Sequence, residues 1–287
     1  MVRSVVVGTD ASRTSEDALL WAADCALARR AELEIVHAFE HSVWGSDRKI
    51  DGVVEREARV LLAARARQAE HRRPGLVVRT HLIVANPAEA LVHASQRAEL
   101  AVVGSGPVSR LTGHLVGSRS YQVAAAAHCP VVVVPALPSP QADDVVAGVD
   151  GSPASIEVVA LAAAEADRLG EELRVVHAWT DPAYLSDGYL LAGFTARVRE
   201  EERIVLAESV AGTAERYPGL LVDEALVEGP PGDVLLSEAR NAKLVVVGSR
   251  GRTGIARLLL GSVSHEVVLG ARCPVLVARN IEAYARG

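Results

Sequence analysis

A glycine- and serine-rich segment in the second half of the chain has the residue types that bind phosphate groups. Gly248-Ser249-Arg250-Gly251 follows an apolar run, and Gly261-Ser262-Val263-Ser264 opens the next helical stretch. Glycine allows close approach of the backbone, and serine hydroxyls with the free amides of a helix N-terminus make an anion site. The same residues also fit a capped helix after a glycine-rich loop. Taken alone, the segment leaves phosphate binding and helix capping both open.

An acidic residue follows the first apolar run in each half of the chain, Asp10 shortly after Gly8 and Asp150 shortly after Gly148. In open α/β sheets, ligands bind beyond the carboxyl ends of the strands, so residues at these positions are candidate site residues.

Histidine and cysteine give no sign of a catalytic or zinc site. His37 and His177 end apolar runs with no Ser or Asp partner nearby in the sequence, so we interpret them as structurally satisfied rather than as general bases. The three cysteines form no CxxC pair and no cluster with histidine at ligand spacing. The sequence therefore predicts no catalytic residue.

The candidates recur because the chain contains an internal duplication. Four segments of the first half return in the second half at a nearly constant offset. They are 6–12 with 146–152 and 36–39 with 176–179, at 140 residues, then 102–105 with 246–249 and 128–131 with 272–275, at 144 residues. Three prolines between the copies indicate a stiff linker. We predict a first domain at 1–136, a linker at 137–142 and a second domain at 143–287.

Within each copy, apolar runs alternate with stretches that have apolar residues at helical spacing. The expected strands are 4–7, 33–38, 77–84, 100–103 and 131–134, then 145–149, 173–178, 220–227, 244–247 and 275–278. Strands that alternate with helices form βαβ units and a parallel sheet covered on both faces. The predicted fold class is α/β, with two tandem doubly wound parallel-sheet domains, each Rossmann-like and five-stranded.

Composition excludes several classes of function. The 287 residues carry 30 basic and 36 acidic side chains, a net charge of −6, which argues against a nucleic-acid-binding protein. No run of 18 uncharged apolar residues appears, which argues against a membrane span. The first strand-like run begins at residue 4, which leaves no room for a signal peptide, so we expect a cytoplasmic protein.

The glycine spacing resembles the ATP-binding signature of the universal stress protein family. Two residues separate Gly248 from Gly251, nine separate Gly251 from Gly261, and Ser262 follows. The acidic turn at 148–152, the Val-His-Ala strand end at 176–178, the helix entry at 228–231 and the Cys-Pro strand at 273–277 occur in the order of the family. The resemblance covers nearly the whole chain, twice over.

The resemblance implies an ATP site in the second copy. Adenine would bind backbone groups at Ala178, and the ribose and phosphates would lie over the 248–251 loop and the 261–264 helix start. The resemblance also implies that Asp150, and Asp10 in the first copy, reach toward the phosphates, directly or through a divalent ion. A carboxylate beside a polyphosphate is repulsive unless a cation intervenes, so Mg²⁺ is the natural bridge, and no certain metal ligand is assigned. The implied binding residues are Gly148, Asp150, Ala178, Val227, Gly248, Arg250, Gly251, Gly261, Ser262, Val263 and Ser264.

The first copy departs from the signature, so its implied site is weaker. Pro107 replaces the middle glycine, which removes an amide donor and fixes φ near −65°. Arg119 replaces Val263 and would either contact phosphate or extend into solvent. The implied residues here are Gly8, Asp10, Ala38, Val84, Gly104, Gly117, Ser118, Arg119 and Ser120.

The resemblance favours an ATP-binding protein with a regulatory or sensing role in the stress response. A slow ATPase or nucleotide-dependent transferase is the first alternative, although no G-x-x-x-x-G-K-[ST] motif is present. A nucleotide-free dimerisation scaffold is the second. The family also implies pairing through the last strand of each copy, as a pseudo-dimer within the chain or as a homodimer of chains. No protein partner of another kind is predicted.

Overall fold

The computed structural model describes residues 3–40, 48–105, 119–181, 192–249, 251 and 260–279. Within these ranges the chain divides into two compact units. The first comprises residues up to Leu137 together with Arg279, and the second spans Pro138–Ala278.

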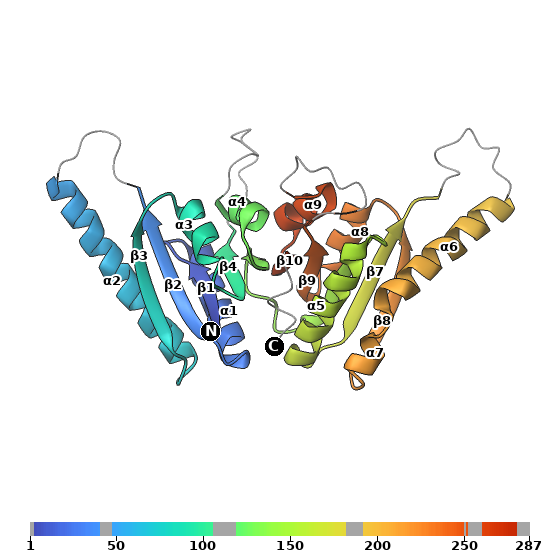
Figure 1. Ribbon diagram of the computed structural model, residues 1–287, viewed down its shortest axis with the longest axis horizontal. Coiled ribbons are helices and arrows are strands. Elements are labelled where there is room, and N and C mark those ends of the chain that lie inside the picture. The colour runs from blue at the N-terminus through green and yellow to red at the C-terminus, as the bar shows by residue number, and fades with distance from the viewer. Residues whose placement is uncertain are drawn as a thin grey trace. The chain divides into compact units, whose positions relative to one another are not determined.

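Each unit contains five strands and the helices that connect them (Figure 1). The elements of the first unit are β1 (Ser4–Gly8), α1 (Arg13–Ala28), β2 (Glu32–Phe39), α2 (Arg48–Arg72), β3 (Val78–Val84), α3 (Pro87–Ala94), β4 (Leu100–Gly104), α4 (Arg119–Ala126) and β5 (Val131–Val134). Those of the second are β6 (Asp143–Val149), α5 (Pro153–Leu169), β7 (Leu173–Trp179), α6 (Ala192–Val210), α7 (Thr213–Arg216), β8 (Val222–Glu228), α8 (Pro231–Glu238), β9 (Ala242–Gly248), α9 (Ser262–Gly270) and β10 (Val275–Ala278).

The strands of each unit form a parallel sheet with the same order. In the first unit the order is β3-β2-β1-β4-β5, and in the second it is β8-β7-β6-β9-β10. The helices α1 and α2 contact each other and the sheet, as do α3 and α4, and the second unit repeats this with α5 and α6, then α8 and α9. The doubly wound α/β fold is therefore confirmed. The strand order reverses beside β1 and β6, where such folds bind ligands.

Small apolar residues, mostly valine, are buried on both faces of strands β1, β4, β5, β9 and β10. All four valines of β5 have no exposed surface, and β10 is buried throughout. Valine fits a pleated surface covered on both sides, which explains why a chain with 3% aromatic residues still forms a continuous core.

The expected strands begin and end within two residues of those observed. Helix α2 spans Arg48–Arg72. The offset between copies grows from 140 at β2 and β7 to 144 at β3 and β8, so the extra residues lie between these strands. There, α6 and α7 stand where the first unit has α2 alone, and Gly212, with φ of 78°, precedes α7.

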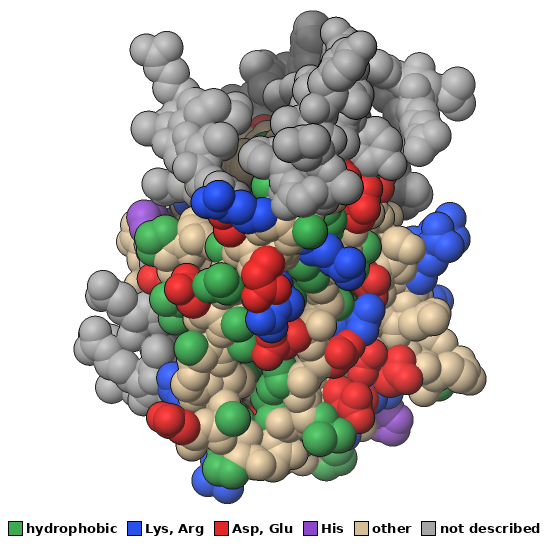
Figure 2. Space-filling model, turned by 90° about the vertical axis from the view of Figure 1, so that its right-hand side faces the viewer, with side chains coloured by type: hydrophobic (Ala, Val, Ile, Leu, Met, Phe, Trp, Pro, Cys, Tyr) green, Lys and Arg blue, Asp and Glu red, His purple; other side chains and the backbone are tan. Residues whose placement is uncertain are grey.

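The surface of the second unit mixes charges of both signs. Figure 2 shows Lys and Arg side chains interspersed with Asp and Glu. Ion pairs on α6 join Arg197 to Glu201 and Arg203 to Glu200. None of the helices in the described ranges is both long enough and apolar enough to cross a membrane.

Candidate functional site

A cavity of about 280 Å³ opens in the second unit at the carboxyl ends of β6, β7 and β9. This volume is close to the lower end of the range for ligand sites, about 300–1,000 Å³. Most residues proposed from the sequence line it, namely Gly148, Asp150, Ala178, Gly248, Gly251, Gly261, Ser262, Val263 and Ser264. The family resemblance, together with the position of residues after each strand, thus identified residues that the fold brings together from four separate segments.

Two of the proposed residues of this unit do not line the cavity as described. Val227 is in register with Ala178, but it belongs to β8, the strand farthest from β9, so it lies beside the cavity rather than in it. Arg250 falls outside the described residues.

Asp150 is held in place by the start of α5. Its Oδ1 accepts hydrogen bonds from the Ser152 amide and the Ser155 hydroxyl, both at 3.0 Å. Its Oδ2 lies so close to Gly251 that a Cβ there would be 2.5 Å away. The φ of Gly251 is outside the left-handed region, so this position needs glycine for space. The carboxylate and the glycine loop therefore fix each other's position.

Helix α9 presents an uncapped N-terminus to the cavity. Its N-cap residue is Gly261, and no side chain caps the helix. The Gly261 amide bonds to the Ser249 carbonyl at 2.9 Å, and the Ser264 hydroxyl donates to the carbonyl of Gly248. Ser264 thus ties the helix to the end of β9, and the N-cap glycine supplies no side-chain acceptor to the first-turn amides. Such amides attract anions.

His177 also lines the cavity, and both of its ring nitrogens have partners. Nδ1 lies 2.9 Å from the Val149 carbonyl oxygen, and Nε2 lies 2.7 Å from Oε2 of Glu202 on α6. The prediction of a structurally satisfied histidine is correct. Glu202 was missed because it lies 25 residues away on a helix whose sequence gives no sign of it.

The first unit has a corresponding cavity of about 350 Å³. The proposed residues that line it are Gly8, Asp10, Ala38, Gly104, Arg119 and Ser120. Val84, which is 51% exposed at the β3 edge, does not line it. Gly117, Ser118 and Pro107 lie outside the described residues, so the altered glycine motif stays a sequence-based expectation.

The Asp10 turn resembles that of Asp150 but is held differently. The Ser12 amide donates to Oδ1 of Asp10 at 2.8 Å, whereas the Ser15 hydroxyl donates to the Asp10 carbonyl, also at 2.8 Å. Partial burial opposes ionisation of Asp10, but the hydrogen bonds from Ser12 and Ser15 outweigh it and hold the pKa of this carboxyl below its ordinary value. Asp10 is therefore ionised at neutral pH.

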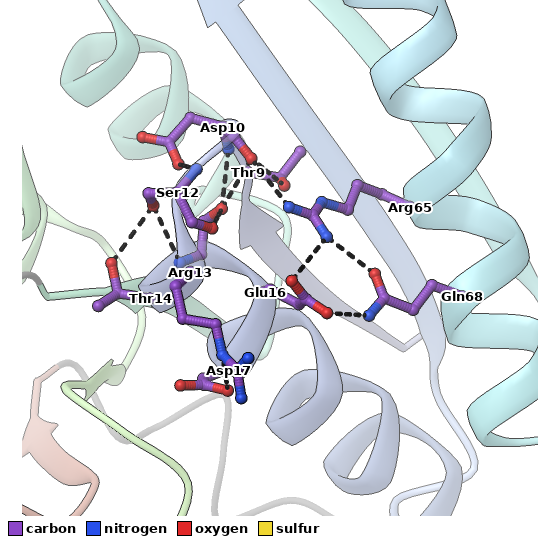
Figure 3. Close-up of polar contacts among 10 residues, drawn as sticks. Thr9, Asp10, Ser12, Arg13, Thr14, Glu16, Asp17, Arg65 and Gln68 are labelled. Atoms are coloured by element: carbon purple, nitrogen blue, oxygen red, sulfur yellow. Dashed lines mark hydrogen bonds and ion pairs between the residues drawn. The ribbon is translucent and has the colours of Figure 1, made fainter.

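An arginine of α2 reaches the same turn in the first unit (Figure 3). Nη2 of Arg65 lies 3.4 Å from the Asp10 carbonyl oxygen, and Nη1 lies 3.4 Å from a carboxylate oxygen of Glu16 on α1. Gln68 joins both residues, accepting from Arg65 at 2.9 Å and donating to Glu16 at 2.7 Å. This polar network connects α1, α2 and the Asp10 turn.

Several site residues were not singled out from the sequence. Ser15 and Ser155 support the acidic turns, and they are 140 residues apart, so the duplication carried a signal that could have found them. Leu91 and Leu235 line the two cavities from α3 and α8. As buried leucines on amphipathic helices, they cannot be distinguished from core residues by pattern alone.

Comparison with known proteins agrees with this fold and duplication. The sequence profile of the universal stress protein family matches residues 1–135 and again 142–279. Universal stress protein Rv2005c of Mycobacterium tuberculosis is 38% identical over 292 residues, which cover 96% of this chain and 97% of the relative. Universal stress protein Rv2623 of the same organism is 37% identical over 288 residues, with 96% of each chain covered.

Among solved structures, a universal stress protein from Archaeoglobus fulgidus shares the fold with a TM-score of 0.70. It is 23% identical, and the match covers 96% of this chain and 98% of that one. Because the family profile matches both halves and the sequence relatives span nearly the whole chain, this protein is a tandem member of the universal stress protein family.

Proposed function

We propose that the protein binds ATP in the cavity of the second unit and acts as a regulatory or sensing protein of the stress response. One observation carries the proposal: the cavity joins a carboxylate, a closely packed glycine loop and the uncapped N-terminus of α9. The strand ends beside them offer backbone groups and small side chains, such as Ala178, to a flat base.

The residues of the cavity fit a nucleotide with its phosphates toward α9. The first-turn amides of α9 and the Gly248–Gly251 segment would receive the phosphates, because amides and a helix N-terminus favour anions. Ala178 would contact the adenine. Asp150 would face the phosphate region, where a bound Mg²⁺ would neutralise charge between carboxylate and phosphate.

Binding rather than catalysis is supported by the ionisable groups of this cavity. Among the described residues that line it, the ionisable side chains are Asp150 and His177. Both nitrogens of His177 are engaged, and Oδ1 of Asp150 accepts two hydrogen bonds that fix the turn. Neither arrangement leaves a base directed at a water or hydroxyl nucleophile, as general base catalysis requires.

The test begins with the protein purified without added nucleotide. After denaturation, mass spectrometry of the released small molecules should identify ATP, with a stoichiometry of about one per chain or more. Calorimetric titration of nucleotide-free protein should then give micromolar affinity, about −8 kcal/mol. Release of no nucleotide, together with no ATP affinity below millimolar, would refute the proposal.

A further inference from the structure

His177 of β7 and Glu202 of α6 form a hydrogen-bonded pair, and the two α2 residues aligned with Glu202 in the first unit are buried and apolar. The His177 side chain is buried, with 4% of its surface exposed. A carbonyl oxygen only accepts hydrogen bonds, so Nδ1 carries a hydrogen toward Val149. Nε2 faces a carboxylate, which also only accepts when ionised. A second proton must therefore lie between the ring and Glu202. Because a carboxyl group is the stronger acid of the two, it resides on the ring.

Helix α6 contacts the acidic turn on both sides of Asp150. On one side, Glu202 reaches Val149 through His177. On the other, Val205 packs against Gly151, where a Cβ would lie 2.4 Å from the valine Cγ1. Asp150 stands between these two contacts, so the position of α6 and the position of the carboxylate are linked.

The first unit makes the equivalent contact without the proton. Nδ1 of His37 lies 2.8 Å from the Thr9 carbonyl oxygen, as in the second unit. The α2 residue equivalent to Glu202 is Leu62 at the offset of 140 or Ala58 at 144, and both are buried and apolar. Arg65 supplies the link from α2 to the turn instead. An arginine stays protonated throughout the ordinary pH range.

Other charged groups around His177 come from each element packed against it. On β8, Leu226 is in register with His177, with Glu224 and Glu228 two residues to either side. The buried residues of the first two turns of α5 are not ionisable, and neither are those of α8, which packs on β7. Asp150 lies at the end of β6. Helix α6 itself carries Arg199, Glu201 and Arg203, of which Glu201 pairs with Arg197 and Arg203 with Glu200.

We propose that Glu202 is a positioning residue of the second cavity, acting through a doubly protonated His177 to fix α6 against the Asp150 turn. The part of this inference that concerns ligand affinity rests on the proposed function. Loss of the ring proton leaves a lone pair on Nε2 facing a carboxylate, so the link opens and the turn is released. Nucleotide affinity at the second cavity then falls as pH rises, by about tenfold for the loss of one charge-assisted hydrogen bond.

The first experiment reads the ring without nucleotide. In the full chain labelled with ¹⁵N-histidine, long-range proton–nitrogen NMR spectra near pH 7 should show both His177 nitrogens protonated. The Glu202→Gln variant assigns the His177 signals by shifting them. A His177 ring with one proton at that pH overturns the inference, whether or not ATP binds.

The second experiment titrates ATP into Glu202 variants on both sides of the His177 transition. In Glu202→Gln, the amide donates to a neutral Nε2, so the link survives without the proton. The ATP affinity of this variant should stay within about twofold of the parent at the lower pH. The pH dependence that remains after the ionisation of ATP itself is subtracted should vanish. Glu202→Ala should lose about tenfold at every pH. Glu201→Gln, a change at the neighbouring exposed residue, is the matched control and should behave as the parent.

The ionisation of ATP itself is common to all variants, so the comparison isolates the protein's proton. An unchanged pH dependence in Glu202→Gln, with fold confirmed by circular dichroism, overturns the inference. A parent protein that binds no ATP but shows the doubly protonated ring refutes the proposed function and supports the link between α6 and the turn.

Discussion

At the scale of single residues, the contact between Gly251 and Asp150 determines the shape of the second cavity. A Cβ at position 251 would lie 2.5 Å from Oδ2, so Gly251→Ala must displace either the carboxylate or the loop. We expect ATP affinity to fall by about tenfold or more, since a hydrogen bond to a charged group is worth about 1.5–3 kcal/mol. Gly219→Ala, which has open space, is the control in the same calorimetric titration. Equal affinities in the two variants would contradict the role of this contact.

A second prediction at this scale is that the two sites are unequal, with the second tighter. Pro107 takes the place of Gly251 in the first copy, and proline lacks the amide hydrogen. The first site should bind ATP more weakly by about one to two orders of magnitude, unless Arg119 compensates. Calorimetry should show Pro107→Gly strengthening the weak site and Gly251→Pro crippling the strong one. If Gly251→Pro binds like the parent, the inequality has another cause.

At the scale of elements, the start of α3 depends on Asn86. Its side-chain oxygen accepts hydrogen bonds from the amides of Ala88 at 3.0 Å and Glu89 at 3.4 Å, and Pro87 occupies the first helical position. Asn86→Ala should lower the free energy of unfolding by about 1 kcal/mol, measured by urea denaturation. Asn86→Ser retains an acceptor and should recover most of it. Helix α3 belongs to the first unit and lines its cavity through Leu91, so the first unit is the one that should be destabilised. Destabilisation of the second unit alone would contradict this role of Asn86.

At the scale of the whole molecule, the buried thiols cause the stability of the fold to fall as the pH rises into the alkaline range. Burial raises the pKa of Cys129 from 9.0 to about 12 and that of Cys273 from 9.0 to about 11. Above about pH 9 the unfolded chain loses these protons while the native chain keeps them, so the free energy of unfolding falls as pH rises. Below the pKa of the thiols in the unfolded chain, they contribute no pH dependence to the free energy of unfolding.

The expected decline is up to about 1.4 kcal/mol per thiol for each pH unit between about 9 and the native values. Denaturant melts over this range measure it. A variant carrying Cys129→Ala and Cys273→Ala should be less stable overall but should show a shallower decline. An identical slope in the variant would assign the alkaline effect to other groups.

Association between chains is the remaining prediction at this scale. β5 and β10 each end the strand order of their unit, and both are apolar throughout. By analogy with the family, we predict pairing of chains and a mass of twice 30.3 kDa by light scattering at micromolar concentration. A monomer mass across a concentration series would reject the homodimer and leave the predicted pairing within the chain untouched.

The sequence by itself determined the duplication, the strand and helix order and most of the second cavity. Period and spacing are local properties: valine runs predict buried strands, and Asn86-Pro87 predicts a helix start. The carboxyl ends of parallel strands meet at one edge, so Asp150, Ala178 and Gly248 could be grouped without coordinates.

Tertiary structure alone decided how those residues are held. The need for glycine at 251 arises from Asp150, about a hundred positions away, and not from a backbone angle that the sequence pattern suggested. The partner of His177 comes from α6, and that of the Asp10 turn comes from α2, because helix packing brings different side chains to equivalent places. Such contacts depend on how one face of a helix packs against the end of a strand. The spacing of residues along the sequence does not encode the distance between two such side chains in the folded protein.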